Sequence, residues 1–228
     1  MGTLINVIAI LIGGGVGLLF RKGFPERISQ TAFHVMGLFT VVVGITMALQ
    51  GREMIMVLVS LAFGGMFGEW VDIEGHLDRW AAGLEKRLNL TETSPAKGFI
   101  YTTLLFCVGS MAIVGSITDG LKGDRSVLVT KSMMDGIIAI PFAAKMGIGV
   151  LGSAIPVLFY QGSITLLAWK LQSLFTPVIV RELTSVGGVI VMGIGVNILG
   201  LQKVRVGNLI PALPFIVVLI YLKVFFIH

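Results

Sequence analysis

Two oppositely charged side chains, Lys131 and Asp135, lie four residues apart within a largely apolar stretch of the sequence. Side chains at this spacing share one face of an α-helix, so the ammonium and the carboxylate can neutralise each other. A charged residue inside a bilayer costs roughly 2.5–3.5 kcal/mol on insertion scales, and such residues therefore pair and face a bundle interior. The spacing predicts a buried pair, with Ser132 beside it, that a solute ion or proton can perturb. The alternative is a pair at the headgroup level, where Lys131 reaches water.

A second polar group, Tyr160 and Gln161, stands in the middle of the apolar stretch 147–170. Pro156 precedes it, removes a backbone donor and frees the carbonyl around Gly152. Gln161 offers two donors and an acceptor to a polar solute or ion. The alternative role is a hydrogen bond between helices, which is worth about 0.6 kcal/mol.

Neutral amides and hydroxyls complete the set of unexpected polar residues in apolar sequence. Such side chains suit a monovalent cation or a small polar solute, although each could instead hold two helices together. Asp119 follows an apolar stretch directly and is expected at the mouth of a cavity. The candidate binding residues are Asp119, Lys131, Ser132, Asp135, Tyr160, Gln161, Asn197, Asn208, Asn6 and Thr46.

The elements that must position these side chains are membrane-spanning helices. Only 13% of the 228 residues are charged and 55% are hydrophobic, whereas a soluble domain carries about 25% charged residues. The apolar blocks reach the roughly 20 residues that a spanning helix needs. We predict an all-α transmembrane bundle of about seven to eight spans near 3–20, 31–50, 54–70, 99–118, 126–145, 147–170, 180–200 and 206–226. For 126–170 we favour two full spans, and two interrupted half-helices are the alternative. We also expect broken central helices in the bundle.

The segment 71–94 has apolar residues at helical spacing and charged residues on its other sides. This pattern favours an amphipathic helix in the membrane interface, and a solvated connector is the alternative. Lys and Arg are modestly more frequent on the side of this segment, which favours the cytoplasm for it and the outside for both termini.

An internal repeat relates 36–63 to 187–214 at an offset of 151 residues, so that Gly37 matches Gly188 and Gly44 matches Gly195. The single domain, 1–228, would then hold repeat-like units near 1–70 and 147–228 around central spans at 98–145. Five passes separate the two starts, so the units would be inverted, as in many secondary transporters. Chance similarity between apolar helices is the alternative.

Motifs for soluble chemistry are missing. The pattern Gly147-Ile148-Gly149-Val150-Leu151-Gly152 lies in an apolar span with no βαβ unit, so we expect no dinucleotide site. The three histidines are far apart, and there is one cysteine. We therefore expect no enzyme, no cofactor and no metal site. The net charge of +5 comes from loops and does not indicate a nucleic-acid partner.

Several stretches carry a resemblance to a known family. They are 109–124, Lys131-Ser132, Asp135-Gly136, 147–150, 153–157, 160–162, 188–197 and Asn208–Leu213. Together they resemble the YqgA/YdfK-like family of uncharacterised bacterial inner-membrane proteins, a domain-of-unknown-function family. Thr118 departs from the glutamine that is usual there. The resemblance implies a multi-pass protein of the bacterial inner membrane and implies no substrate.

The sequence favours a secondary transporter or ion-conducting protein for a small polar or ionic solute. The alternative is a non-transporting structural or regulatory scaffold. The lipid bilayer is the expected partner in both cases, and the small-residue pair Gly13 and Gly17 could form the face of a homodimer.

Overall fold

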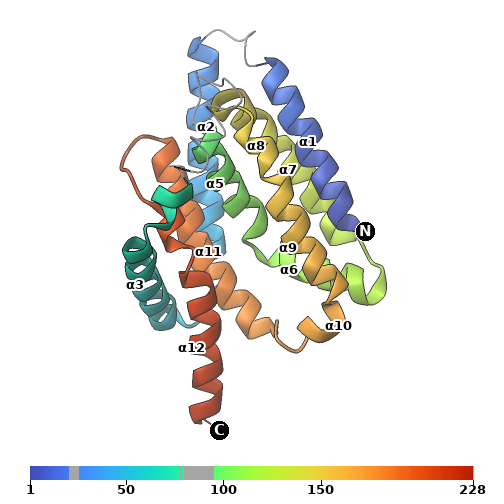
Figure 1. Ribbon diagram of the computed structural model, residues 1–228, viewed down its shortest axis with the longest axis vertical. Coiled ribbons are helices and arrows are strands. Elements are labelled where there is room, and N and C mark those ends of the chain that lie inside the picture. The colour runs from blue at the N-terminus through green and yellow to red at the C-terminus, as the bar shows by residue number, and fades with distance from the viewer. Residues whose placement is uncertain (21–25, 78, 80–94, 228) are drawn as a thin grey trace.

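The computed structural model describes residues 1–20, 26–77, 79 and 95–227, and this part of the chain is helical without strands (Figure 1). The helices are α1 (Gly2–Phe20), α2 (Glu26–Ala48), α3 (Met54–Val71), α5 (Pro95–Cys107), α6 (Ser110–Lys122), α7 (Ser126–Met146), α8 (Gly149–Gly152), α9 (Ala154–Leu166), α10 (Ala168–Leu171), α11 (Pro177–Ile198), the 3₁₀ turn η1 (Val206–Leu209) and α12 (Ala212–Ile227). After a turn at Asp72, residues 73–77 are helical; the rest of the predicted amphipathic helix 71–94 lies outside the described residues, apart from residue 79.

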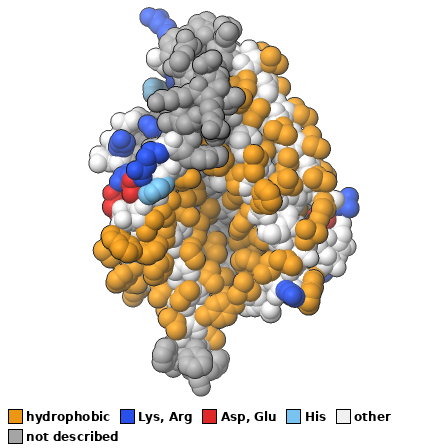
Figure 2. Space-filling model, in the orientation of Figure 1, with side chains coloured by type: hydrophobic (Ala, Val, Ile, Leu, Met, Phe, Trp, Pro, Cys, Tyr) orange, Lys and Arg blue, Asp and Glu red, His pale blue; other side chains and the backbone are white. Residues whose placement is uncertain are grey.

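The helices are long and apolar enough to cross a membrane. Among the described residues six helices meet this condition, and the bent pair α5–α6 makes a seventh. The apolar part of α2, Phe33–Ala48, is shorter. Hydrophobic side chains cover most of the visible surface, and charged side chains gather where α3 ends (Figure 2). The predicted all-α polytopic bundle is confirmed, and 126–170 forms two spans, α7 and α8–α9.

Helix α1 runs parallel to α7 at very short distance. A Cβ on Gly13 would lie 2.0 Å from the Gly136 carbonyl oxygen, and one on Gly17 would lie 2.1 Å from that of Ile140. Only a residue without a side chain allows two backbones to approach so closely. The glycine face predicted for a homodimer is therefore occupied within the chain.

Helix α2 pairs with α11 in the antiparallel direction through glycines on both helices. A Cβ on Gly44 would lie 2.7 Å from the Gly188 carbonyl oxygen, and one on Gly195 would lie 2.9 Å from that of Gly37. Helix α3 packs beside α12 in the same antiparallel way. These pairs join segments about 150 residues apart in the chain.

The chain runs back and forth between two ends of the bundle, which we name by one residue each. The Asp119 end holds both termini, the α2–α3 turn, the α6–α7 turn and α10 (Figure 1). The Arg205 end holds the turns that follow α3, α7 and α11. Tyr221 near the C-terminus donates a hydrogen bond to the Leu174 carbonyl at 3.0 Å, which places the last turns of α12 at the Asp119 end.

The broken helix is the pair α5–α6, which bends by 59°. Gly109 at the break has φ +151°, a conformation that side-chain-bearing residues rarely adopt. The expectation of broken central helices is confirmed, and the predicted span 99–118 corresponds to this bent pair. Helix α7 continues through Pro141. Pro156 lies in the first turn of α9, where its missing N–H has no helical partner to lose.

Candidate functional site

The predicted charge pair forms inside the bundle. Lys131 Nζ donates to Asp135 Oδ1 at 2.9 Å and to Oδ2 at 2.7 Å. The two side chains are only 8% and 5% exposed. Because the pair is removed from solvent on a helix that contacts α1, α2, α5 and α6, each charge depends on the other for compensation.

Two amide side chains extend this pair across the bundle. Asn6 Nδ2 on α1 donates to Asp135 Oδ2 at 2.9 Å and to Gln161 Oε1 on α9 at 3.3 Å. Both amides are fully buried. The structure thus brings four of the predicted residues together from three helices that are far apart in sequence. We name Asn6, Lys131, Asp135 and Gln161 the polar cluster.

An open cleft of about 420 Å³ reaches the charge pair from one side. It lies between α2, α7 and the break between α5 and α6. Most of its lining is apolar, and its polar residues are Thr46, Gln50, Gly109, Ser110, Lys131 and Asp135. The first N–H groups of α6 start at this break, and a helix N-terminus favours negative charge. The cleft is therefore lined by one basic side chain, Lys131, one acidic side chain, Asp135, and mostly apolar residues.

Three predicted residues lie near the cluster without joining its hydrogen bonds. The Thr46 hydroxyl lines the cleft and donates to the Val42 carbonyl of its own helix at 2.9 Å. Ser132 donates to the Leu128 carbonyl in the same way at 2.6 Å. Tyr160 packs half-buried against the apolar core. Only Thr46 of the three faces the space that a solute could enter.

Asp119 holds the start of α1 and is not part of the cluster. Its Oδ2 accepts a hydrogen bond from the Gly2 backbone N–H at 2.6 Å, and its Oδ1 lies 3.3 Å from Arg125 Nε. A carboxylate that accepts from the first N–H groups of a helix stabilises the positive end of that helix. Asp119 therefore positions Asn6, which lies one turn further along α1.

Asn197 stabilises the turn that follows α11. Its Nδ2 donates to the Val204 carbonyl at 2.7 Å and to the Tyr101 hydroxyl at 3.0 Å, and its Oδ1 accepts from the Val204 N–H at 2.7 Å. These bonds use both donors and the acceptor of the amide. In this structure Asn197 therefore holds the turn and does not join the polar cluster.

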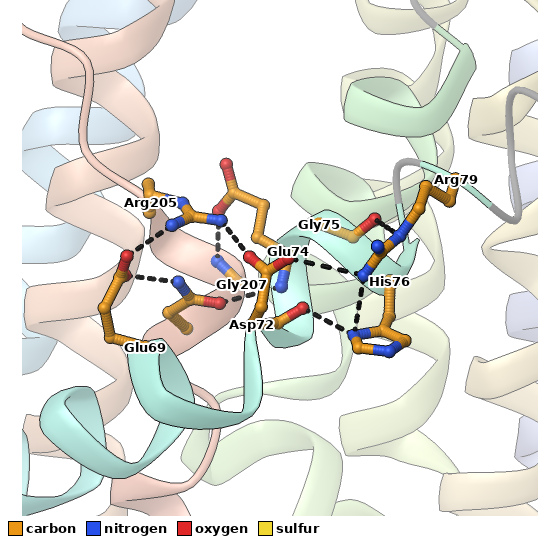
Figure 3. A network of polar contacts seen from close by, with 9 residues as sticks. Glu69, Asp72, Glu74, Gly75, His76, Arg79, Arg205 and Gly207 are labelled. Atoms are coloured by element: carbon orange, nitrogen blue, oxygen red, sulfur yellow. Dashed lines mark hydrogen bonds and ion pairs between the residues drawn. The ribbon is translucent and has the colours of Figure 1, made fainter.

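Asn208 joins a separate network at the Arg205 end (Figure 3). Its Oδ1 accepts from the Glu74 N–H at 2.7 Å, and its Nδ2 donates to Glu69 Oε2 at 2.5 Å. Arg205 donates to both Glu69 and Asp72, and the Gly207 N–H donates to Glu74 Oε2 at 2.8 Å. The Arg205 hydrogen bond lowers the pKa of Asp72 below its ordinary value. This network fastens the end of α3 to η1.

The sequence reasoning attached no site to Glu182, a fully buried carboxylate at the start of α11. Its two oxygens accept from the N–H groups of Arg52 at 3.0 and 3.2 Å and of Glu53 at 3.1 Å, and Arg181 Nε lies 2.9 Å away. It holds the turn that begins α3. The backbone groups of Arg52 and Glu53 are 130 and 129 residues away in the chain, so spacing along the chain carried no signal for this turn. Among the described residues no group of three His, Cys, Asp or Glu could hold a metal ion.

Comparison with known proteins identifies the family of this chain. Residues 1–221 match the family model described as "Protein of unknown function (DUF554)". The chain belongs to this family. It is 32% identical over 216 residues to the uncharacterised membrane protein YdfK of Bacillus subtilis (strain 168), covering 93% of this chain and 92% of the relative. It is 28% identical over 218 residues to the uncharacterised protein YqgA of Escherichia coli (strain K12), covering 93% of each. No solved structure matches. The resemblance stated from the motifs is confirmed.

Proposed function

We propose that this protein is a secondary transporter or ion-conducting protein for a small polar or ionic solute, and that it acts in the bacterial inner membrane. The observation that carries the proposal is the Lys131–Asp135 pair, which is buried in a membrane protein and yet lines an open cleft. Ionisable residues within membrane-spanning segments are rare and mark pathways for ions, protons and substrates.

The two charges give the cleft a means of binding and release. A solute with an anionic group can replace Asp135 beside Lys131, and a cationic group can replace Lys131 beside Asp135. The member of the pair that loses its partner must be neutralised at the same time, by a proton or by an opposite charge on the solute, because a buried charge requires compensation. The apolar remainder of the cleft suits the body of a small solute.

The break at Gly109 supports the same proposal. Transporter sites are typically formed where spanning helices are interrupted, because the freed backbone groups can face the solute.

The reciprocal glycine contacts of α2 and α11 are a second support. If the two segments are repeats, Gly37 corresponds to Gly188 and Gly44 to Gly195. Gly44 contacts Gly188 and Gly37 contacts Gly195, so the contacts are symmetric, as a two-fold axis in the membrane plane would require.

The proposal is tested with purified protein in proteoliposomes. We expect flux of protons, of monovalent cations or of amino acids, with Asp135→Asn and Gln161→Ala reducing it by about tenfold or more, as expected when an ion-pair or hydrogen-bond contribution is lost. Thr118→Val is the matched control, because the Thr118 hydroxyl bonds only to carbonyls of its own helix. Wild-type protein without flux of any of these solutes would contradict the proposal and favour the scaffold alternative.

A further inference from the structure

A second polar region lies behind the charge pair, between α1, α6 and α9. It contains three buried side-chain atoms that have no hydrogen-bond partner among the described residues: Asn6 Oδ1, Ser116 Oγ and Gln161 Nε2. An unsatisfied buried polar atom costs about 1–3 kcal/mol. Native proteins usually satisfy such atoms with ordered water. A fourth atom of this kind is Thr103 Oγ1 on α5.

The three atoms lie at one level of the bundle. A Cβ on Gly120 would lie 2.2 Å from the Thr165 carbonyl oxygen, so α6 and α9 touch at this point. Both helices run toward the Asp119 end, and one turn earlier on each stand Ser116 and Gln161. Asn6 is hydrogen-bonded to Gln161 from α1. The three residues therefore stand at one level of the bundle on three helices that contact one another, next to the polar cluster.

A row of polar groups continues from these three residues to the surface. One turn nearer the Asp119 end, the Thr3 and Thr165 hydroxyls are 3.5 Å apart. The next groups are the Gly2 N–H and Asp119, which is paired with the half-exposed Arg125. Hydroxyl, amide and carboxylate groups thus follow one another from Asp135 to solvent.

We propose that internal water held by Asn6, Ser116 and Gln161 connects Asp135 to the Asp119 end, and that this water carries the proton that Asp135 binds and releases. The inference rests on the proposed transport function and makes the proton its coupling ion. A proton enters from surface water, moves through the internal water and bonds to the Asp135 carboxylate, whose negative charge it neutralises, and it leaves by the reverse steps. A protonated Asp135 no longer neutralises Lys131, so protonation and the binding of an anion in the cleft favour each other.

The chemistry of the three atoms favours water over a metal cation. Because the Asp135 carboxylate only accepts hydrogen bonds, Asn6 must direct its Nδ2 toward it, which leaves Oδ1 as the free acceptor. Gln161 presents Nε2, a free donor. Water donates to the first atom and accepts from the second, whereas a cation would leave Gln161 Nε2 unpaired.

The other ionisable groups around Asp135 are few. Lys131 is on the same helix, and the Cys107 thiol on α5 lies close enough to interact with both members of the pair. Tyr160 on α9 lies near Cys107, and Asp119 on α6 is paired with Arg125. A pH-dependent signal that disappears in Asp135→Asn and persists in Cys107→Ser therefore belongs to the Asp135 carboxyl group.

The test is infrared spectroscopy of the purified protein in lipid, with the carboxyl C=O band of protonated Asp135 followed after transfer to D₂O. We expect hydrogen–deuterium exchange of this carboxyl group to slow by about tenfold in Gln161→Leu and measurably in Ser116→Ala, since each removes a hydrogen bond from the row. Thr118→Val is the control and should exchange as the wild type does, because the Thr118 hydroxyl bonds only to carbonyls of its own helix. Unchanged exchange in both variants, or the absence of an Asp135 band at every pH at which the protein stays folded, would overturn the inference.

An experimental structure with ordered solvent is the second test and does not depend on how the variants fold. We expect water within hydrogen-bond distance of Asn6 Oδ1, Ser116 Oγ and Gln161 Nε2. A dry contact there, or a bound sodium ion, would overturn the inference. Neither test needs a transported solute. Slowed exchange without any flux would therefore reject the transport function and leave the water route standing, and flux with unchanged exchange would do the reverse.

Discussion

Asn6 and Asp135 are 129 residues apart in the chain, and the amide of the first donates to the carboxylate of the second at 2.9 Å. This bond joins α1 to the helix that carries the charge pair. It also fixes the orientation of the Asn6 amide, because only its nitrogen can face an acceptor. The first helix is thereby part of the polar cluster, although its sequence has no ionisable side chain.

The first prediction concerns the charge pair itself. Lys131→Met and Asp135→Leu should each destabilise the protein by roughly 3–5 kcal/mol, because each leaves a buried charge unpaired. The double variant should be closer to the wild type than either single variant. Thermal unfolding of the purified proteins in one detergent measures all four forms. Single variants as stable as the double variant would show that neither charge needs the other.

Close packing of α1 on α7 gives the second prediction. Gly13→Ala should destabilise by about 1–3 kcal/mol, because its Cβ would lie 2.0 Å from the Gly136 carbonyl oxygen and the backbones must separate. Gly15→Ala is the matched control, since a Cβ there meets nothing within 4 Å. The two variants should differ in unfolding temperature. Equal temperatures would argue against the α1–α7 contact.

The buried carboxylate Glu182 gives the third prediction. Glu182→Gln should destabilise by about 1.5–3 kcal/mol, because it removes the charge that accepts from the Arg52 and Glu53 N–H groups. Glu53→Gln affects a partly exposed ion pair with Lys223 and should cost about 1 kcal/mol or less. Urea or thermal unfolding compares the two. A larger effect at Glu53 would contradict the assignment.

The network in Figure 3 gives a prediction on pH. The Arg205 hydrogen bond lowers the pKa of Asp72, so the carboxylate contributes to stability above the ordinary value of about 3.9 and loses this contribution as the pH falls through the lowered pKa. In Arg205→Gln the pKa of Asp72 should rise toward its ordinary value. Arg79→Gln should raise it less, because the Arg79 guanidinium lies 3.4 Å from Asp72 Oδ2 and lowers the pKa less than Arg205 does. Carbon-detected NMR titration of the labelled carboxyl group measures both.

Much of the fold could be predicted because length and hydropathy determine where a chain can cross a bilayer. The end of the first span before Arg21 and the turn between the second and third spans at Gly51 follow from charge and glycine. The Lys131–Asp135 pair follows from its spacing on one helix. These features depend on residues that are near one another in the chain.

The remaining features depend on contacts between distant segments. Asparagine often binds ions and polar solutes, yet Asn197 and Asn208 hold turns in this structure. Each amide oxygen accepts a hydrogen bond from a backbone N–H, that of Val204 and that of Glu74 respectively. The roles of Glu182 and Ser116 depend on segments that are far away in the chain, so neighbouring residues do not reveal them. The break at Gly109 was missed because a glycine in an apolar span is usually a packing position, and only its φ of +151° distinguishes it.

The glycine contacts of α1 with α7 and of α2 with α11 also constrain how the protein is made. When α1 and α2 leave the ribosome, the helices that they must pack against have not yet been synthesised. Asn6 then has neither Asp135 nor Gln161 as a partner, and the glycine grooves are open to lipid or to an insertion factor. Non-local contacts of this kind form late in folding. The N-terminal half should therefore be short-lived when it is produced alone, and co-expression of the C-terminal half should rescue it.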